Sequence, residues 1–156
     1  MVDVIIKKTA DLTPTELVMI FQHRVSVFVV EQHCPYQEVD QDDFQAIHVF
    51  LLNNNKELNG YTRIIERKEQ IEFGRVLVPK SFRKENFGKL IVQETIAEIK
   101  RRFPKKPIKI SAQAYLIRFY SAFGFKKISE VYLEDGIPHI DMILSGATQD
   151  SKEESL

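Results

Sequence analysis

The chain has 156 residues, and its 22 Lys and Arg balance its 22 Asp and Glu, so the formal net charge is zero. This length suits one domain, and the balanced charge excludes a bulk polycation that coats nucleic acid. Cys34 is the only cysteine, which excludes an intramolecular disulfide, and no apolar run reaches the roughly 18 residues of a membrane span.

The first part of the chain predicts a strand over residues 2–7 and then a helix. Thr13 can cap this helix, Pro14 suits its first position, and Glu16 can complete a capping box. Apolar residues at helical spacing continue to residues 28–31, where we expect the helix to end before a proline.

Three strand-like runs follow, separated by turn-like polar residues, and they predict an antiparallel meander. They cover residues 46–52, 58–66 and 70–78.

The second half predicts a long helix, a buried strand, a short helix and a closing hairpin. The Asp135-Gly136 pair is a strong turn signal for that hairpin. The expected ranges are 87–102 for the long helix, 108–112 for the strand, 114–123 for the short helix, and 127–133 with 138–144 for the hairpin strands.

This order of elements predicts an α+β fold with a mixed, mostly antiparallel central sheet of about seven strands, flanked by helices on both faces. We expect residues 1–144 to form a single domain. The polar segment 145–156 predicts a flexible tail. No segment resembles a signal peptide, and we expect a cytoplasmic protein.

The most informative stretch lies where the third strand of the meander leads into the long helix. Arg83, Lys84 and Lys89 place positive charge at the start of a helix, where unpaired backbone N–H groups attract phosphate. Asn86 and Gly88 tolerate a positive φ or a close backbone approach. The stretch therefore predicts a pyrophosphate site, against the alternative of a basic connection with no ligand.

A second stretch places Tyr120 on a short helix that ends at Gly124. Taken alone, a tyrosine near a helix end is more often a core residue with its hydroxyl at the rim. Beside the phosphate-type loop, a functional role for Tyr120 gains weight against this core interpretation.

Together these two stretches resemble the GNAT superfamily of N-acetyltransferases. The phosphate signature reads Arg83-x-x-Asn86-x-Gly88, with Asn86 where the family has its first glycine. Tyr120 stands four residues before a Gly-Phe pair, as in the family's second signature. The resemblance covers roughly residues 2–144.

The N-terminal half resembles one branch more closely, the ElaA-like branch. The run from Arg24 to Asp43, followed by His48, carries this resemblance, and so does the segment 134–140.

The resemblance implies direct attack of an amine on the thioester of acetyl-CoA, without a metal. It implies that the backbone of Val76, Leu77 and Val78 pairs with the pantetheine arm, and that a backbone N–H there, of Leu77, polarises the thioester carbonyl. The remaining coenzyme-binding residues that it implies are Arg83, Lys84, Glu85, Asn86, Phe87, Gly88, Lys89, Gln113 and Phe119.

Tyr120 is the candidate acid that the resemblance gives for the leaving thiolate. The acceptor ammonium must also lose a proton, since a lysine-like amine has a pKa of about 10.4. Glu72 is the candidate base, because its position eleven residues before Arg83 resembles that of the glutamate base in the histone-acetylating branch of the family. His48 ranks second, and Glu31 and Glu38 are further rivals.

The segment 31–43 holds five carboxylates and neither Lys nor Arg. Such a run is usually a solvated loop, but the family builds its acceptor site after the first helix. We therefore predict that Glu31, Glu38 and Asp40 bind a cationic acceptor, either a small molecule or a protein amine.

Other classes of function remain open at this point. Residues 80–109 hold ten Lys and Arg against three Asp and Glu, but no reading motif supports nucleic-acid binding. The histidines lack the spacing of metal ligands, and Cys34 lacks an identifiable base. The serious rival is a non-catalytic acyl-CoA-binding sensor or partner subunit. Nothing in the sequence decides between a monomer and a homodimer, and we expect no membrane partner.

Overall fold

The structure, a computed structural model, describes residues 1–146 of the chain. The predicted tail lies outside the described residues from position 147 onward. Two compact units divide the chain: the first comprises Met1–Ile65 and Arg75–Thr95, and the second comprises Glu66–Gly74 and the chain from Ile96. The predicted single domain over residues 1–144 therefore stays a prediction.

Within residues 1–146, eight strands form a sheet in the order β1-β2-β3-β4-β5-β8-β6, with β7 pairing to β8 outside this path. The β4–β5 pair is parallel, whereas β1–β2, β2–β3 and the pairs that β8 makes are antiparallel. The predicted α+β class with a mixed, mostly antiparallel sheet is confirmed. The strands are β1 Val2–Lys8, β2 Ile47–Asn53, β3 Leu58–Glu66, β4 Ile71–Leu77, β5 Ile108–Gln113, β6 Lys126–Lys127, β7 Tyr132–Glu134 and β8 Ile137–Leu144.

The helices are α1 Pro14–Val25, α2 Phe87–Arg102 and α3 Ile117–Ser121. At the start of α1, the Thr13 hydroxyl accepts the Glu16 N–H while the Glu16 carboxylate accepts the Thr13 N–H, which confirms the predicted capping box. A π-helical segment, Ser26–Glu31, continues α1 to the predicted end.

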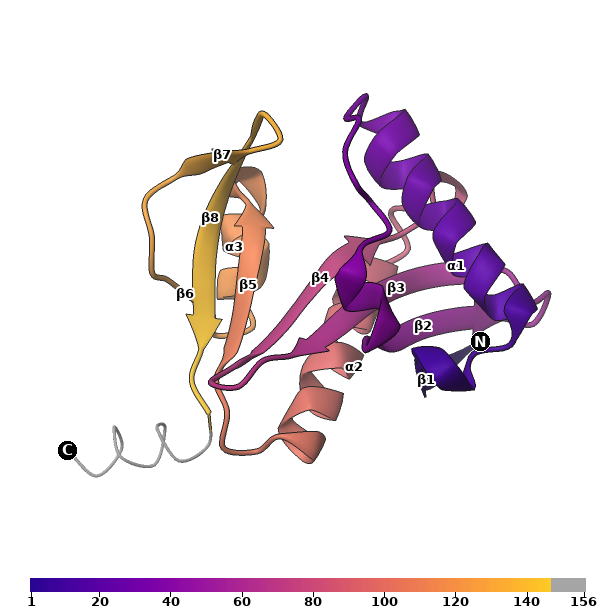
Figure 1. Cartoon of the computed structure of the whole chain (residues 1–156), viewed down its shortest axis with the longest axis horizontal. Coiled ribbons are helices and arrows are strands. Elements are labelled where there is room, and N and C mark those ends of the chain that lie inside the picture. The colour runs from indigo at the N-terminus through magenta and orange to yellow at the C-terminus, as the bar shows by residue number, and fades with distance from the viewer. Residues whose placement is uncertain (147–156) are drawn as a thin grey trace. The chain divides into compact units, whose positions relative to one another are not determined.

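In the first unit, β2 and most of β3 are buried on both faces. The sequence of β2 is accordingly a near-continuous apolar run, whereas β3 also buries the polar residues Asn59, Thr62 and Arg63. Ile20 of α1 packs against Phe50 and Tyr61, and Figure 1 shows α1 beside β2 and β3. Leu77, near the end of β4, belongs to the same apolar cluster. This packing fixes the strand end that leads into the phosphate-type loop.

In the second unit, β5 pairs with β8 over six positions, and Tyr120 of α3 packs against the rings of Phe73 and Phe125. The predicted short helix is a 3₁₀ turn, Ala114–Leu116, followed by α3, and Gly124 has the positive φ of 99° expected after a helix end.

The closing hairpin differs from the prediction in its first strand. Asp135 and Gly136 both have positive φ, as a two-residue hairpin turn requires. The predicted strand 127–133 is instead two short pieces, β6 and β7. Between them the Ser129 hydroxyl accepts the Asp141 N–H in place of a backbone carbonyl, which interrupts the ladder.

Among residues 1–146, no helix combines the length and apolar character that crossing a bilayer requires.

The capping box gives a direct test of the α1 start. Thr13→Ala should lower the free energy of unfolding by about 1 kcal/mol, because the Glu16 N–H loses its acceptor. Urea denaturation at pH 7 measures the change. Thr15→Ala, at an exposed position of the same turn, is the matched control, and an equal loss in both variants would contradict the capping role.

Candidate functional site

The segment between β4 and α2 adopts two left-handed backbone positions, Lys84 with φ 70° and Asn86 with φ 65°. The Asn86 carbonyl accepts the Leu90 N–H at 3.1 Å, so Asn86 occupies the position just before the helix. Asparagine tolerates the left-handed region better than most residues. The expectation that Asn86 provides a positive φ is confirmed.

The start of α2 has room for an anion. The N–H groups of the first helical turn have no intrahelical acceptor, and the helix dipole adds a partial positive charge. A Cβ built on Gly88 meets no atom within 4 Å, so the space beside this first turn is open. With Lys84 and Lys89 nearby in sequence, the backbone and the charges suit a pyrophosphate.

Arg83 lies over the end of the preceding strand. Its Nε donates to the Val78 carbonyl at 2.9 Å, and its Nη2 donates to the Glu31 carboxylate at 2.8 Å. Both side chains are partly exposed to solvent. Glu31, predicted as an acceptor ligand, is therefore the counter-ion of Arg83 here.

The acidic segment 31–43 is not the free acidic surface that its sequence suggested. Glu38 and Asp43 are buried, with 3% and 4% of their surface exposed, and Arg24 of α1 contacts both. Arg63 of β3 pairs with Asp40 at 2.7 Å and with Asp43 at 3.2 Å. The interpretation of Glu38 as an open site for a cation is wrong, because Arg24 and Arg75, which are distant from it in the sequence, already neutralise its carboxylate.

Burial by itself would raise the pKa of Asp43, but hydrogen bonds from Arg24 and from the Asp40 N–H outweigh it. The pKa of Asp43 falls to about 2 as a result. Asp43 therefore stays ionised at neutral pH and remains a permanent partner for Arg24 and Arg63.

His48, the second candidate base, is fully buried on β2. Its Nδ1 lies 2.6 Å from the Tyr61 hydroxyl and its Nε2 lies 2.8 Å from the Thr9 hydroxyl. Burial, together with the charge of Arg24, lowers the pKa of His48 to about 4. With both ring nitrogens engaged inside the core, this geometry argues against His48 as a base for an external substrate.

Tyr120 lies in the second unit, buried among Phe73, Phe119 and Phe125 with ring centroids 5.0–6.4 Å away. Burial raises the pKa of Tyr120 above its ordinary value, with a smaller contribution from Tyr115. The hydroxyl is therefore protonated at neutral pH, which a proton donor requires.

Two other predicted residues also belong to the second unit. The Glu72 carboxylate accepts from the Arg67 Nε at 3.2 Å and from the Gln70 side chain at 2.8 Å, and it is partly exposed. Gln113 ends β5, where it pairs in register with His139 of β8.

Sequence reasoning missed the arginines that hold the acidic segment. Arg24, Arg63 and Arg75 lie on three different elements, and the carboxylate partners of each arginine are 14 or more positions away in the sequence. A usable signal exists for Arg75, since it falls on the face of β4 whose neighbours Phe73 and Leu77 are buried. A charged residue at such a position needs a partner.

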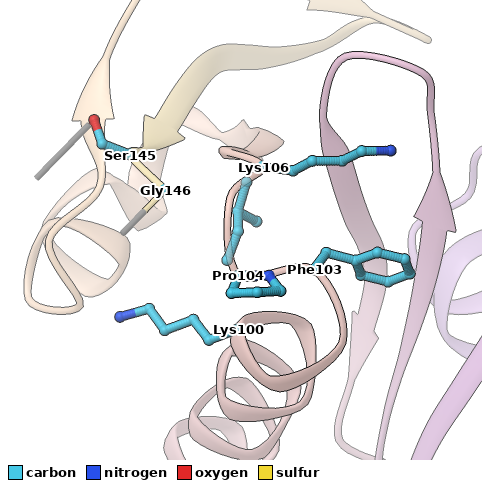
Figure 2. A pocket seen from close by; sticks show the side chains of 7 residues that line it. Lys100, Phe103, Pro104, Lys106, Ser145 and Gly146 are labelled. Carbon is cyan, nitrogen blue, oxygen red and sulfur yellow. The ribbon is translucent and has the colours of Figure 1, made fainter. Parts of the chain in front are cut away.

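A small cavity of about 100 Å³ lies elsewhere in the second unit (Figure 2). Figure 2 shows Lys100 and Lys106 extending in opposite directions from it, and the Lys106 ammonium donates to the Arg67 carbonyl. Ligand pockets for molecules of cofactor size are typically 300–1,000 Å³. The cavity contains none of the predicted site residues, and it is too small for a coenzyme.

The chain is similar to known proteins in both sequence and structure. Residues 9–145 match the model of the acetyltransferase (GNAT) domain. Protein ElaA of Escherichia coli is 41% identical over 137 residues, covering 85% of this chain and 90% of ElaA. The crystal structure of E. coli ElaA has a TM-score of 0.87 at 38% identity and covers 92% of this chain and 99% of that one. An acyl-CoA N-acyltransferase from Pseudomonas aeruginosa has a TM-score of 0.89 at 37% identity and covers 93% and 100%.

The buried histidine predicts a pH dependence of stability. Because the folded state lowers the pKa of His48 to about 4, the unfolded chain binds a proton first as pH falls below about 6.5. The contribution of neutral His48 to the free energy of unfolding should be fully present above pH 6.5, and it should decline by up to about 3 kcal/mol as the pH falls towards 4. Urea denaturation of His48→Gln should show a flatter dependence over this window. Identical pH slopes for the two proteins would contradict the prediction.

Proposed function

Because the chain belongs to the GNAT acetyltransferase family, on the match over residues 9–145 and its identity to ElaA, we propose that it transfers an acetyl group from acetyl-CoA to a primary amine. The match to the family and the identity to ElaA confirm the resemblance seen in the sequence. Membership of this family makes the protein an acyltransferase. The donor, the acceptor class and the residue roles below are our proposal.

The observation that carries the proposal is the start of α2. Left-handed Asn86 and open Gly88 together present the first-turn N–H groups to solvent. A pyrophosphate fits this geometry because backbone donors, the helix dipole and Lys84 and Lys89 all favour an anion. The relative from P. aeruginosa is an acyl-CoA N-acyltransferase, which supports a donor of the same chemical class.

Bound acetyl-CoA would supply an activated acetyl thioester, and the chain would supply its placement and polarisation. We assign the backbone of Val76, Leu77 and Val78 to the pantetheine arm. The buried Leu77 side chain anchors this part of β4 in the core, so its backbone is held firmly. An N–H fixed in this way, that of Leu77, polarises the carbonyl without reorganising during the reaction.

Tyr120 donates the proton that the departing thiolate needs. Its raised pKa keeps the hydroxyl protonated at neutral pH until the transfer. Phe119 and Gln113 are assigned to the coenzyme's surroundings in the same unit.

Glu72 is the base that we propose for the acceptor ammonium. It is partly exposed, whereas Glu38 is bound by arginines and His48 is buried with both nitrogens engaged. Among the predicted acceptor ligands, Glu31 and Asp40 keep about a third of their side-chain surface exposed. A cationic amine would meet these two carboxylates at their exposed edges, beside the arginines that already pair with them.

Thermal unfolding tests the donor and the loop together. Acetyl-CoA and coenzyme A at about 100 times their Kd should each raise the Tm by roughly 5–10 °C, and ATP should not. Gly88→Ala should leave the Tm of the free protein unchanged or higher, because the added Cβ meets no atom. The same Cβ occupies the open space beside the first turn of α2, where we place the pyrophosphate, so the coenzyme-induced rise in Tm should be smaller.

A full coenzyme shift in Gly88→Ala would contradict the proposed loop. No shift in the wild-type protein with either coenzyme species would contradict the donor itself.

Tyr120→Phe tests the proton donor. We expect kcat to fall about 10²-fold or more, with the Kd for acetyl-CoA close to wild type, because only the hydroxyl is lost. Release of coenzyme A thiol with a panel of polyamines, aminosugars and lysine esters measures kcat. Tyr115→Phe, at an exposed position of the same unit, is the matched control. Unchanged turnover in Tyr120→Phe would remove the tyrosine from this role.

A further inference from the structure

Arg75 has a left-handed backbone, with φ 50°, inside the extended strand β4. A residue with a Cβ pays roughly 1–2 kcal/mol in this region, whereas glycine adopts it at no steric cost. The preceding residue is a glycine, Gly74, yet the positive φ falls on the arginine. The unusual backbone conformation therefore falls on a residue with a long, charged side chain.

The Arg75 guanidinium is bound by one short segment of chain. Its Nε lies 2.8 Å from the Glu38 carboxylate, and its Nη2 donates to the Glu38 carbonyl at 3.0 Å and to the Asp40 carboxylate at 3.3 Å. It also lies 5.5 Å from the centre of the Tyr36 ring. These charge-assisted contacts fix both the position and the orientation of the guanidinium plane.

The segment that binds Arg75 is itself held from two further elements. Arg24 of α1, which is fully buried, donates to Glu38 at 2.5 Å and to Asp43 at 2.6 Å. Arg63 of β3 donates to Asp40. Three arginines thus balance three carboxylates, so Arg75 is attached to a fixed frame and not to a mobile loop.

We propose that Arg75 is a positioning residue for acyl transfer: its attachment to Glu38 and Asp40 fixes the left-handed turn of β4 and so directs the backbone N–H groups that follow it. Those groups belong to Val76–Val78, to which the proposed function assigns the pantetheine and the thioester carbonyl. This inference rests on that function. A small rotation at residue 75 would misalign the N–H of Leu77, and a misplaced donor loses most of its effect on the carbonyl.

Calorimetric titration with two ligands tests this role without a known acceptor. Coenzyme A lacks the acetyl carbonyl, so the ratio of its Kd to that of acetyl-CoA reports the contact made by the directed N–H. We expect the wild-type protein to prefer acetyl-CoA. Arg75→Gly tolerates the left-handed φ but lacks the guanidinium, and it should reduce the preference about threefold to tenfold while the Kd for coenzyme A changes little.

Arg75→Lys and Lys56→Gly complete the design. The lysine variant keeps the charge without the planar fork and should give an intermediate ratio; it also serves if the glycine variant does not fold. Lys56, at an exposed turn of the same unit with φ 62°, is the matched control for a change of left-handed residue, and Lys56→Gly should leave the ratio at the wild-type value.

An unchanged ratio in both Arg75 variants would overturn the inference, since Arg75 would then only tether the acidic segment. A wild-type ratio of one would overturn it as well, because no N–H would be holding the carbonyl. If the wild-type protein binds neither ligand, the proposed function fails first and the inference falls with it, which separates the two failures.

Discussion

The first unit depends on a network of ion pairs in which three arginines, Arg24, Arg63 and Arg75, meet the carboxylates of Glu38, Asp40 and Asp43. Four of these six residues are buried, whereas Arg75 and Asp40 are half-buried. Charged groups are costly to bury, and a buried pair is weak evidence for stability by itself. Removing one member, however, would leave an uncompensated charge, so the set holds α1, β3, β4 and the acidic segment in one arrangement. This network fixes the positions of its members, because it connects the end of β4, which we assign to the thioester, with α1.

The proposed coenzyme site uses backbone more than side chains. The left-handed Asn86, the open first turn of α2 and the end of β4 all present main-chain groups. This explains how the departure at Asn86 from the family's glycine is accommodated, since asparagine adopts the same φ. In the mechanism that we propose, Tyr120 donates a proton to the thiolate and Glu72 accepts one from the acceptor ammonium, and neither residue takes part in the ion-pair network of the first unit. Damage to positioning and damage to proton transfer should therefore be separable by mutation.

Local signals in the sequence were sufficient for much of the fold. The capping box at Thr13, the strand β3, the helix α2 and the left-handed Asn86 follow from patterns within a few residues. The pairing of Arg24 with Asp43, or of Arg75 with Asp40, joins residues 19 and 35 positions apart, and no local pattern encodes it. For the same reason Glu38 looked free and His48 looked available. The first strand of the hairpin is broken where the Ser129 hydroxyl accepts the Asp141 N–H, and hydrophobic periodicity does not reveal such a contact.

The proposed chemistry requires that this chain bind acetyl-CoA and polarise its thioester with a fixed backbone N–H. The ¹³C resonance of acetyl-CoA labelled at the acetyl carbonyl, recorded free and bound to the protein, measures this polarisation. A hydrogen bond from a rigid donor withdraws electron density from the carbonyl, so the bound resonance should move downfield. A bound ligand whose carbonyl resonance equals that of free acetyl-CoA would contradict polarisation by a backbone N–H.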